Sequence, residues 1–552
     1  MLQDDLQSFV QNLYKYLVSE EECTMGMLVK KHSTKLQTQG DFSFLNTATA
    51  WQEFLCDEQL QRIDGTLLKC VDKDIADLIK TSKDWPIRIE KAVEVKNRIH
   101  LFLDRQRAIR AAFQSAINNH AEILKIISTD TTVVKIDPYC INTNCITYLR
   151  LKCTSEVLKN LYLIRSYPKI QNLIIVVTWR SSYKYLGSDM ASLDVQSVFC
   201  GTVLNARTCL KEKSVTASEY IRLRQDELTL IAQHKYGLRV STEEKWKDFI
   251  AYLGESAVAF ELLQTKCSSP VKIQFDASGG SSKGAAFILY NGARLESIIR
   301  TFEEKVAEGS YPSLPSLENT DLSLLTDEDE WSLIFTYIMG LPSLLDSSVC
   351  VDESTLVRRH DDRVHEFRPH LICKFLSNMV KRFSQYYRRV RILTEPRQHL
   401  LPVLYARIHM LTILNNTLKL CLRILNIKSV SQMYIMSNRD FINMSIADLI
   451  QAAEYIERRE RVFFVAESEH GYASSLPAYE ETRAGGRRPK TKKSQGSRTT
   501  HNELEKNSGR RDKSTSEGNV DSEDNGSNQD GHTPLFAPVR PVRPRAPEFI
   551  SL

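Results

Sequence analysis

The sequence predicts a chain in which two α/β units are followed by an all-α unit and a disordered tail. Gly and Pro together number 38, and only 23 of them occur in the first 464 residues, as expected of a body rich in helix. Short apolar runs typical of strands are confined to the first 240 residues, and helical spacing dominates after them. The last part of the chain is polar and charged, with few aliphatic residues.

Length and composition exclude several classes of protein. A chain of 552 residues has room for roughly three to four units. The net charge of +5 is too small to indicate a nucleic-acid binder by itself. The start MLQDDLQSFV is acidic where a signal peptide is basic, so we expect a reduced, intracellular protein. The longest apolar run, at 173–177, is far too short to span a membrane, and the cysteines lack zinc-site spacing, so we expect no membrane or metal partner.

The first unit, residues 1–128, has the pattern of a small α/β domain. Leu2, Leu6, Phe9, Leu13 and Leu17 recur at helical spacing. Apolar residues then alternate with polar ones between residues 87 and 103, which is typical of half-buried strands. Helical spacing returns at residues 105–127. The unit is therefore predicted to contain two flanking helices and a sheet.

The second unit, residues 129–240, alternates short apolar runs at 132–136, 173–177 and 198–204 with helical stretches such as 155–164. This alternation predicts a parallel, Rossmann-like sheet. Neither GxGxxG nor GxxxxGK[ST] occurs in the chain, so the sheet has no nucleotide fingerprint and we expect no cofactor.

The third unit, residues 241–435, is predicted to be helical, with long helices at 284–304, 370–391 and 399–427. The second of these has an apolar stripe formed by Leu371, Phe375, Met379, Phe383, Tyr386 and Val390. Lys374, Lys381 and Arg388 repeat every seven residues, so they align on one side at intervals of about 10 Å. Such a row of cations suits a phosphate backbone, although an ordinary solvated face is the alternative.

Five further residues of this unit are candidates for nucleic-acid contact. Arg389 adjoins the row of cations, and Arg407 lies off the apolar stripe of the next helix. Tyr290, Asn291 and Arg294 could stack on and hydrogen-bond to an unpaired base, with a purely structural role as the alternative.

Five blocks of the helical unit resemble the anticodon-binding (DALR) domain of arginyl-tRNA synthetases. They are AYLGESAVAFELL (251–263), IQFDASGG (273–280), FILYNGAR (287–294), FSQYYRRVRIL (383–393) and LRILNIKSVSQM (422–433). Together with EWSLIFTYIMGLPSLL (330–345), they make the unit most similar to a non-catalytic family, the DALR anticodon-binding domain-containing proteins. The resemblance implies a helical-bundle DALR domain preceded by a degenerate class I synthetase sheet.

The resemblance also implies that aminoacylation has been lost. CITYLR (145–150) stands where the synthetases have HVGHLR, so Cys145 and Tyr148 replace two histidines that stabilise transferring phosphates. Thr147 replaces the glycine that lets ATP approach. Of the second signature, KMSK, only Lys213 and Ser214 are present. We therefore expect no enzyme activity, with a divergent synthetase as the alternative.

What the resemblance implies for function is a tRNA-binding adaptor. The family is associated with arginine tRNAs and supports 3-methylcytidine formation in their anticodon loop by a separate S-adenosylmethionine-dependent methyltransferase. By the same analogy, residues 1–128 would contact the tRNA elbow. An interaction scaffold that does not bind RNA is the alternative.

The C-terminal part is expected to hold a short helical extension at 436–465 and a disordered basic and proline-rich tail at 466–552. RRPKTKK at 487–493 could be a nuclear import signal or a nonspecific RNA contact. Prolines at 538, 541, 544 and 547 have polyproline II spacing, which suits an SH3-type ligand or a merely solubilising terminus. We expect a cytoplasmic protein, with a nuclear pool as a further option.

Overall fold

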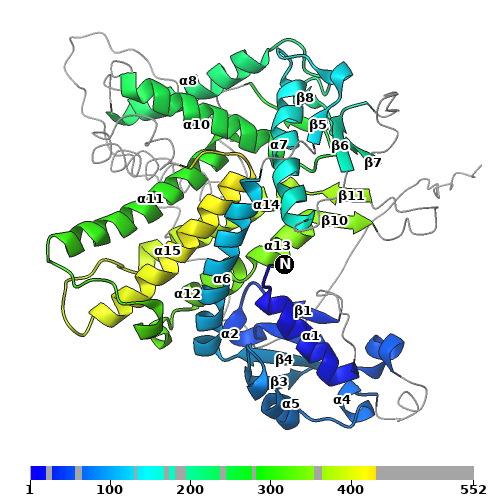
Figure 1. Ribbon diagram of the computed structural model, residues 1–552, viewed down its shortest axis with the longest axis vertical. Coiled ribbons are helices and arrows are strands. Elements are labelled where there is room, and N and C mark those ends of the chain that lie inside the picture. The colour runs from blue at the N-terminus through cyan, green and yellow to red at the C-terminus, as the bar shows by residue number, and fades with distance from the viewer. Residues whose placement is uncertain are drawn as a thin grey trace, which may run out of the picture. The chain divides into compact units, whose positions relative to one another are not determined.

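The computed structural model describes residues 2–19, 28–55, 65–129, 134–166, 173–180, 194–236, 244–275, 281–352 and 364–429 (Figure 1). All of these belong to one compact unit, Met1–Ala473. The predicted extension at 436–465 lies outside the described residues, as does the tail with its basic cluster and proline repeat. The predicted mixed α/β and all-α class is confirmed.

An antiparallel sheet with strand order β1-β2-β4-β3 forms the centre of the N-terminal part. The strands β3 and β4 are joined by Lys96 and Asn97, which both have positive φ, as a tight two-residue hairpin requires. The Asp4 side chain begins the first helix by accepting hydrogen bonds from the backbone N–H groups of Leu6 and Gln7. The elements are α1 (Asp5–Val18), β1 (Val29–Lys31), α2 (Leu36–Gln39), β2 (Phe42–Leu45), η1 (Ala48–Phe54), α4 (Leu67–Cys70), α5 (Ile75–Thr81), η2 (Ser82–Asp84), β3 (Ile89–Val95), β4 (Arg98–Leu103) and α6 (Arg105–Ile127).

A second sheet has the order β5-β6-β7 and is parallel throughout, which confirms the prediction from its apolar runs. The run at 198–204 is two strands rather than one, because Gly201 separates them where a Cβ atom would lie 2.4 Å from the backbone of Ser269. The strand β8 instead pairs in parallel with β9. The elements are β5 (Val134–Ile136), η3 (Pro138–Cys140), α7 (Ile146–Ser166), β6 (Leu173–Thr178), β7 (Asp194–Phe199), β8 (Val203–Asn205), α8 (Ala217–Tyr236) and β9 (Val271–Ile273).

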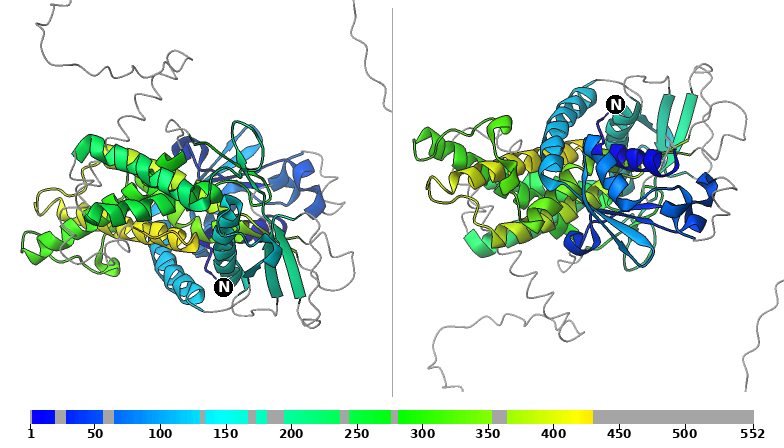
Figure 2. Two further views of the ribbon diagram at one scale, coloured as in Figure 1. Left: turned by 90° about the horizontal axis from the view of Figure 1, so that it is seen from above. Right: turned by 90° about the horizontal axis from the view of Figure 1, so that it is seen from below.

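Long helices dominate the remaining described residues, and α11, α14 and α15 pack against one another (Figures 1 and 2). The three predicted helices are confirmed with bounds shifted by a few residues, whereas β9, β10 and β11 were not predicted. The elements are α10 (Glu244–Leu263), α11 (Ser281–Ala307), η4 (Leu317–Asn319), η5 (Leu322–Leu324), α12 (Glu328–Leu333), the π-helical segment η6 (Ile334–Ile338), α13 (Leu341–Ser348), β10 (Val349–Asp352), β11 (Val364–Phe367), α14 (Pro369–Arg389) and α15 (Leu401–Ile424).

The N-terminal part packs on the helical part through α6, which lies along α15. Aromatic rings add a second contact, because Phe42 of β2 meets Phe335 of η6 edge to face with 5.6 Å between centroids. Trp331 Nε1 donates to Asp41 Oδ1 at 2.7 Å, so a buried carboxylate also joins the two parts. These contacts place β2 beside α12 and η6.

We expect buried His120 of α6 to make stability depend on pH. Its Nε2 lies 3.1 Å from Thr417 Oγ1, and burial lowers the imidazole pKa to about 4, from an ordinary value of 6.5. The unfolded chain therefore binds a proton between these values that the folded chain does not. This contribution to stability is present above pH 6.5 and is lost as the pH falls toward 4, by about 2 kcal/mol between pH 7.5 and pH 5.

The measurement is urea unfolding of the parent and His120→Gln at both pH values. His120→Gln should lose less stability on acidification than the parent. The exposed His399 supplies a matched control, since His399→Gln should behave as the parent does. An equal loss in the parent and in His120→Gln would contradict this origin.

Candidate nucleic-acid interface

The helix α14 carries the predicted row of cations on its exposed side. Pro369 occupies the first turn, where its missing N–H costs nothing, and Arg388 and Arg389 lie in the last turn, where cations favour the helix dipole. Lys374, Lys381 and Arg388 are all exposed. Among the described residues, neither lysine forms an ion pair, while Arg388 Nη2 donates to Ser384 Oγ at 3.3 Å. The two lysines of the row therefore present their ammonium groups to solvent.

The buried face of α14 is rotated slightly from the predicted apolar stripe. Met379, Phe383 and Tyr386 are buried as predicted, but Leu371, Phe375 and Val390 are only half-buried. Their places in the core are taken by Ile372, Cys373, Leu376 and Val380.

Arg389 and Arg407 both form ion pairs with carboxylates of α12. Arg389 forms an ion pair with Asp329, and Arg407 Nε lies 2.8 Å from Glu330 Oε1. Glu330 is fully buried and also accepts from the Tyr386 hydroxyl at 2.8 Å. A buried carboxylate is stable only when it is paired and hydrogen-bonded, so both arginines stabilise carboxylates of α12. The Arg407 side chain is 20% exposed and that of Arg389 is 63% exposed.

Tyr290, Asn291 and Arg294 lie inside the protein on α11, and all three side chains are buried. The Arg294 guanidinium lies 4.4 Å from the ring centroid of Tyr290 and 4.7 Å from that of Tyr387, which are cation–π distances. Asn291 Nδ2 donates to the carbonyl of Phe287. Helices α14 and α15 pack against α11, so the three candidate base-contacting residues are buried within the helical part.

The three candidate residues of the degenerate ATP motif lie at the start of α7, Thr147 and Tyr148 in its first turn and Cys145 just before it. Thr147 is buried, and its Oγ1 accepts from the Val203 backbone N–H at 3.1 Å. Cys145 pairs with Thr216 through an isolated antiparallel bridge, and Tyr148 is half-buried. The threonine hydroxyl is therefore used to join α7 to β8.

Arg150, in the same helix, is buried, and among the described residues its hydrogen bonds all go to backbone. Its guanidinium donates to four carbonyl oxygens, those of Gly201 (2.5 Å), Ser269 (2.8 Å), Leu262 (3.2 Å) and Lys266 (3.2 Å). In the segment that should hold the second signature, Lys213 is exposed and Ser214 hydrogen-bonds to Glu212. Arg150 and Ser214 thus have structural contacts within the protein.

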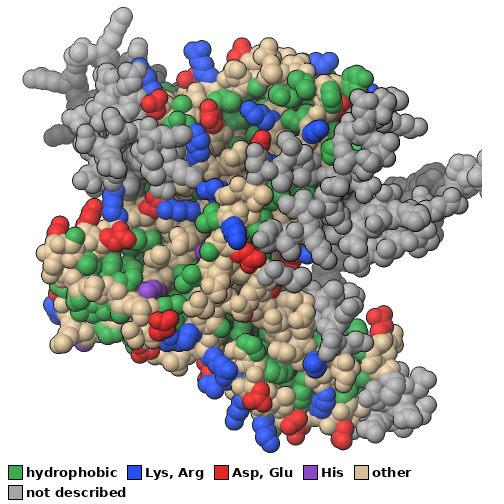
Figure 3. Space-filling model, in the orientation of Figure 1, with side chains coloured by type: hydrophobic (Ala, Val, Ile, Leu, Met, Phe, Trp, Pro, Cys, Tyr) green, Lys and Arg blue, Asp and Glu red, His purple; other side chains and the backbone are tan. Residues whose placement is uncertain are grey.

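Basic and acidic side chains alternate over the face of the molecule seen in Figure 3. This mixture agrees with the small net charge of +5. Any phosphate-binding surface must therefore be local, and a row of aligned cations such as that of α14 can provide it. In the part of the chain that the structure describes, no helix is both long and apolar enough to cross a lipid bilayer.

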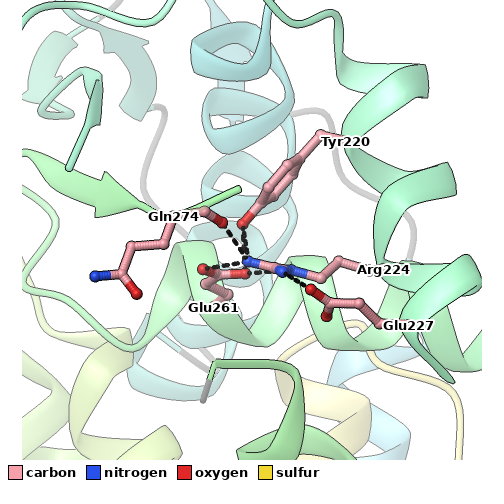
Figure 4. A network of polar contacts seen from close by, with 5 residues as sticks. All are labelled: Tyr220, Arg224, Glu227, Glu261 and Gln274. Carbon is pink, nitrogen blue, oxygen red and sulfur yellow. Dashed lines mark hydrogen bonds and ion pairs between the residues drawn. The ribbon is translucent and has the colours of Figure 1, made fainter. Parts of the chain in front are cut away.

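A buried ionic network centred on Arg224 of α8 was not predicted (Figure 4). Arg224 Nη1 lies 2.7 Å from Glu227 Oε1, and Nε lies 3.3 Å from Glu261 Oε2 on α10. Its Nη2 donates to the Tyr220 hydroxyl and to the carbonyl of Gln274. The i, i+3 spacing of Arg224 and Glu227 could have indicated their pairing, but the contact with Glu261 could not be read from local sequence. The network joins α8, α10 and the end of β9.

Residues 288–433 match the family model of the DALR anticodon binding domain, which covers most of α11 and all of α12 to α15. A Danio rerio protein named DALR anticodon-binding domain-containing protein 3 is 32% identical over 240 residues, or 43% of this chain. The chain matches 41% of the length of that relative. The predicted resemblance of the helical unit is thereby confirmed, and the relative is named for its DALR domain and not as a synthetase.

Two other similarities concern different extents of the chain. Max dimerization protein 1 of Xenopus tropicalis is 55% identical over 65 residues, which is 12% of this chain and 27% of that protein. The structure of Thermus thermophilus arginyl-tRNA synthetase aligns with 77% of this chain and 99% of its own, with a TM-score of 0.44 and 10% identity.

We expect Arg224→Met to destabilise the protein by about 3 kcal/mol or more, because Glu261 would stay buried without its cation. Urea unfolding at pH 7.5 measures this loss. Arg222→Met, at an exposed position of the same helix, is the matched control and should change stability by less than about 0.5 kcal/mol. The double variant Arg224→Met with Glu261→Leu should recover part of the loss. An unchanged stability of Arg224→Met would contradict the role of the network.

Proposed function

We propose that this protein is a non-catalytic tRNA-binding adaptor that recognises arginine tRNAs and supports their 3-methylcytidine modification by a partner methyltransferase. The proposal is carried by one observation: the exposed cations of α14 lie within the stretch that matches the DALR anticodon binding domain. The row formed by Lys374, Lys381 and Arg388 has the charge and spacing that suit RNA phosphates. It lies in a domain whose name describes anticodon binding.

The contacts within the helical part assign different tasks to its cations. Lys374 and Lys381 form no ion pair among the described residues, so phosphate contact breaks no existing interaction. Arg389 and Arg407 are paired with α12 carboxylates and would lose these pairs if they moved to RNA. We therefore place phosphate contact at the row of cations and a supporting role at the two paired arginines.

Two parts of the proposal rest on the family resemblance. These are the preference for arginine tRNAs and the S-adenosylmethionine-dependent methyltransferase that would carry out the methyl transfer. We also propose that the adaptor acts in the cytoplasm, with a nuclear pool as a further option. Contacts of α7 support the proposal that the protein is non-catalytic. Thr147 and Arg150 lie in the degenerate ATP motif, and both hydrogen-bond to the protein's own backbone.

Charge reversal on α14 tests the proposal. The triple variant Lys374→Glu, Lys381→Glu and Arg388→Glu should weaken arginine tRNA binding at least tenfold. Each lost phosphate contact should also reduce the slope of log affinity against log salt by roughly 0.7 to 0.9. Fluorescence anisotropy with arginine and non-arginine tRNAs over a salt series measures both effects.

The matched control reverses three exposed cations that lie outside both the DALR match and residues 1–128, Lys135, Arg222 and Lys272, with the same change in net charge. It should bind tRNA as the parent does. If the parent binds no tRNA, alone or with its methyltransferase, the adaptor proposal fails and an interaction scaffold replaces it. Equal affinity for all tRNAs would refute the arginine preference, and charging of tRNA that depends on ATP and arginine would refute the non-catalytic assignment.

A further inference from the structure

A groove of about 670 Å³ lies beside the row of cations on α14. Its walls come from distant parts of the chain, because Lys31, Ser33 and Thr34 belong to the N-terminal part and Lys374 and Lys381 belong to α14. Residues of η6 and α13 also line it. Four of the lining residues are Lys or Arg, and none of the described lining residues is acidic.

The N-terminal wall is fixed on the helical part. Lys31 Nζ donates to the carbonyl of Phe335 in η6 at 3.2 Å and lies 4.7 Å from the centroid of the Phe335 ring. Burial lowers the pKa of Lys31 to about 8, and the charge of Asp4 opposes this shift. Together with the hydrogen bond between Trp331 and Asp41, these contacts hold both walls before any ligand binds.

The chemistry of the lining fits a strand of RNA better than an acidic peptide. Lys374 and Lys381 supply cations for phosphates, and the exposed Ser33 and Thr34 supply hydroxyls that can donate to phosphate or accept from a ribose 2′-OH. The half-buried ring of Phe375, packed edge to face on Tyr337 at 5.2 Å, adds an aromatic surface. Phosphates, ribose hydroxyls and flat bases occur together in RNA.

We infer that this groove binds a backbone segment of the RNA and that the N-terminal part contributes directly to the same interface as α14. The inference rests on the proposed tRNA-binding function and deepens it. It assigns to the loop after β1 a contact with the RNA segment that lies along α14. The interface is then a two-walled groove, with Lys374 and Lys381 on one wall and Ser33 and Thr34 on the other.

The test adds negative charge to the wall that the first proposal does not involve. Ser33→Glu combined with Thr34→Glu should lower the affinity of the full-length protein for arginine tRNA at least fivefold. Gln37→Glu combined with Thr38→Glu on α2 is the matched control, since both residues are exposed and lie outside the groove lining. Since neither residue lines the groove, the control should bind within twofold of the parent.

A second measurement does not depend on charge. A photo-crosslinking amino acid at position 33 should crosslink to bound tRNA, and the same amino acid at position 37 should not. If the Ser33→Glu, Thr34→Glu variant binds tRNA within twofold of its control and position 33 does not crosslink, the groove inference fails.

The outcomes separate this inference from the proposed function. Loss of binding in the α14 triple variant, with unchanged binding in the Ser33→Glu, Thr34→Glu variant, would leave the adaptor standing and overturn the groove. Unchanged tRNA binding with loss of methyltransferase binding would make the groove a protein contact and also overturn it. If the parent binds no tRNA, both proposals fall together.

Discussion

The short acidic helix α12 holds three parts of the chain together through buried or partly buried carboxylates. Glu330 accepts from Tyr386 of α14 and pairs with Arg407 of α15, while Glu328 pairs with Arg105 of the N-terminal part. Burying a carboxylate costs far more than burying an apolar group unless cations and donors surround it. Arg407 and Arg105 are therefore held by carboxylates of α12. Lys374 and Lys381 on α14 are exposed to solvent.

The same constraint explains why the candidate interface could be predicted only in part. The seven-residue spacing of Lys374 and Lys381 is a local property, and α14 exposes both side chains as the spacing indicates. The pairing of Arg389 with Asp329 depends on a helix some 60 positions earlier, which no local pattern reveals. Tyr290 is a residue type that can stack on bases, but its side chain is buried because α14 and α15 pack against α11. This packing cannot be read from the local sequence.

The fold shows the same division between local and distant causes. Helices with a clear 3.6-residue period, such as α6 and α15, were predicted with nearly correct bounds because their pattern lies within the segment. The short strands β8 and β9 were missed as a pair, since Gly201 allows a close approach of the backbone at Ser269 that is visible only in three dimensions. Arg150 likewise looks like a remnant of an active site until its four carbonyl partners are known.

The π-helical segment η6 faces two different parts of the molecule. A π turn holds about one residue more than an α turn, so neighbouring side chains are spaced differently around the axis. Within Ile334–Ile338, Phe335 contacts Phe42 and Lys31 of the N-terminal part, whereas Thr336 and Tyr337 line the groove. One turn of helix thus anchors the sheet and shapes the binding surface at the same time.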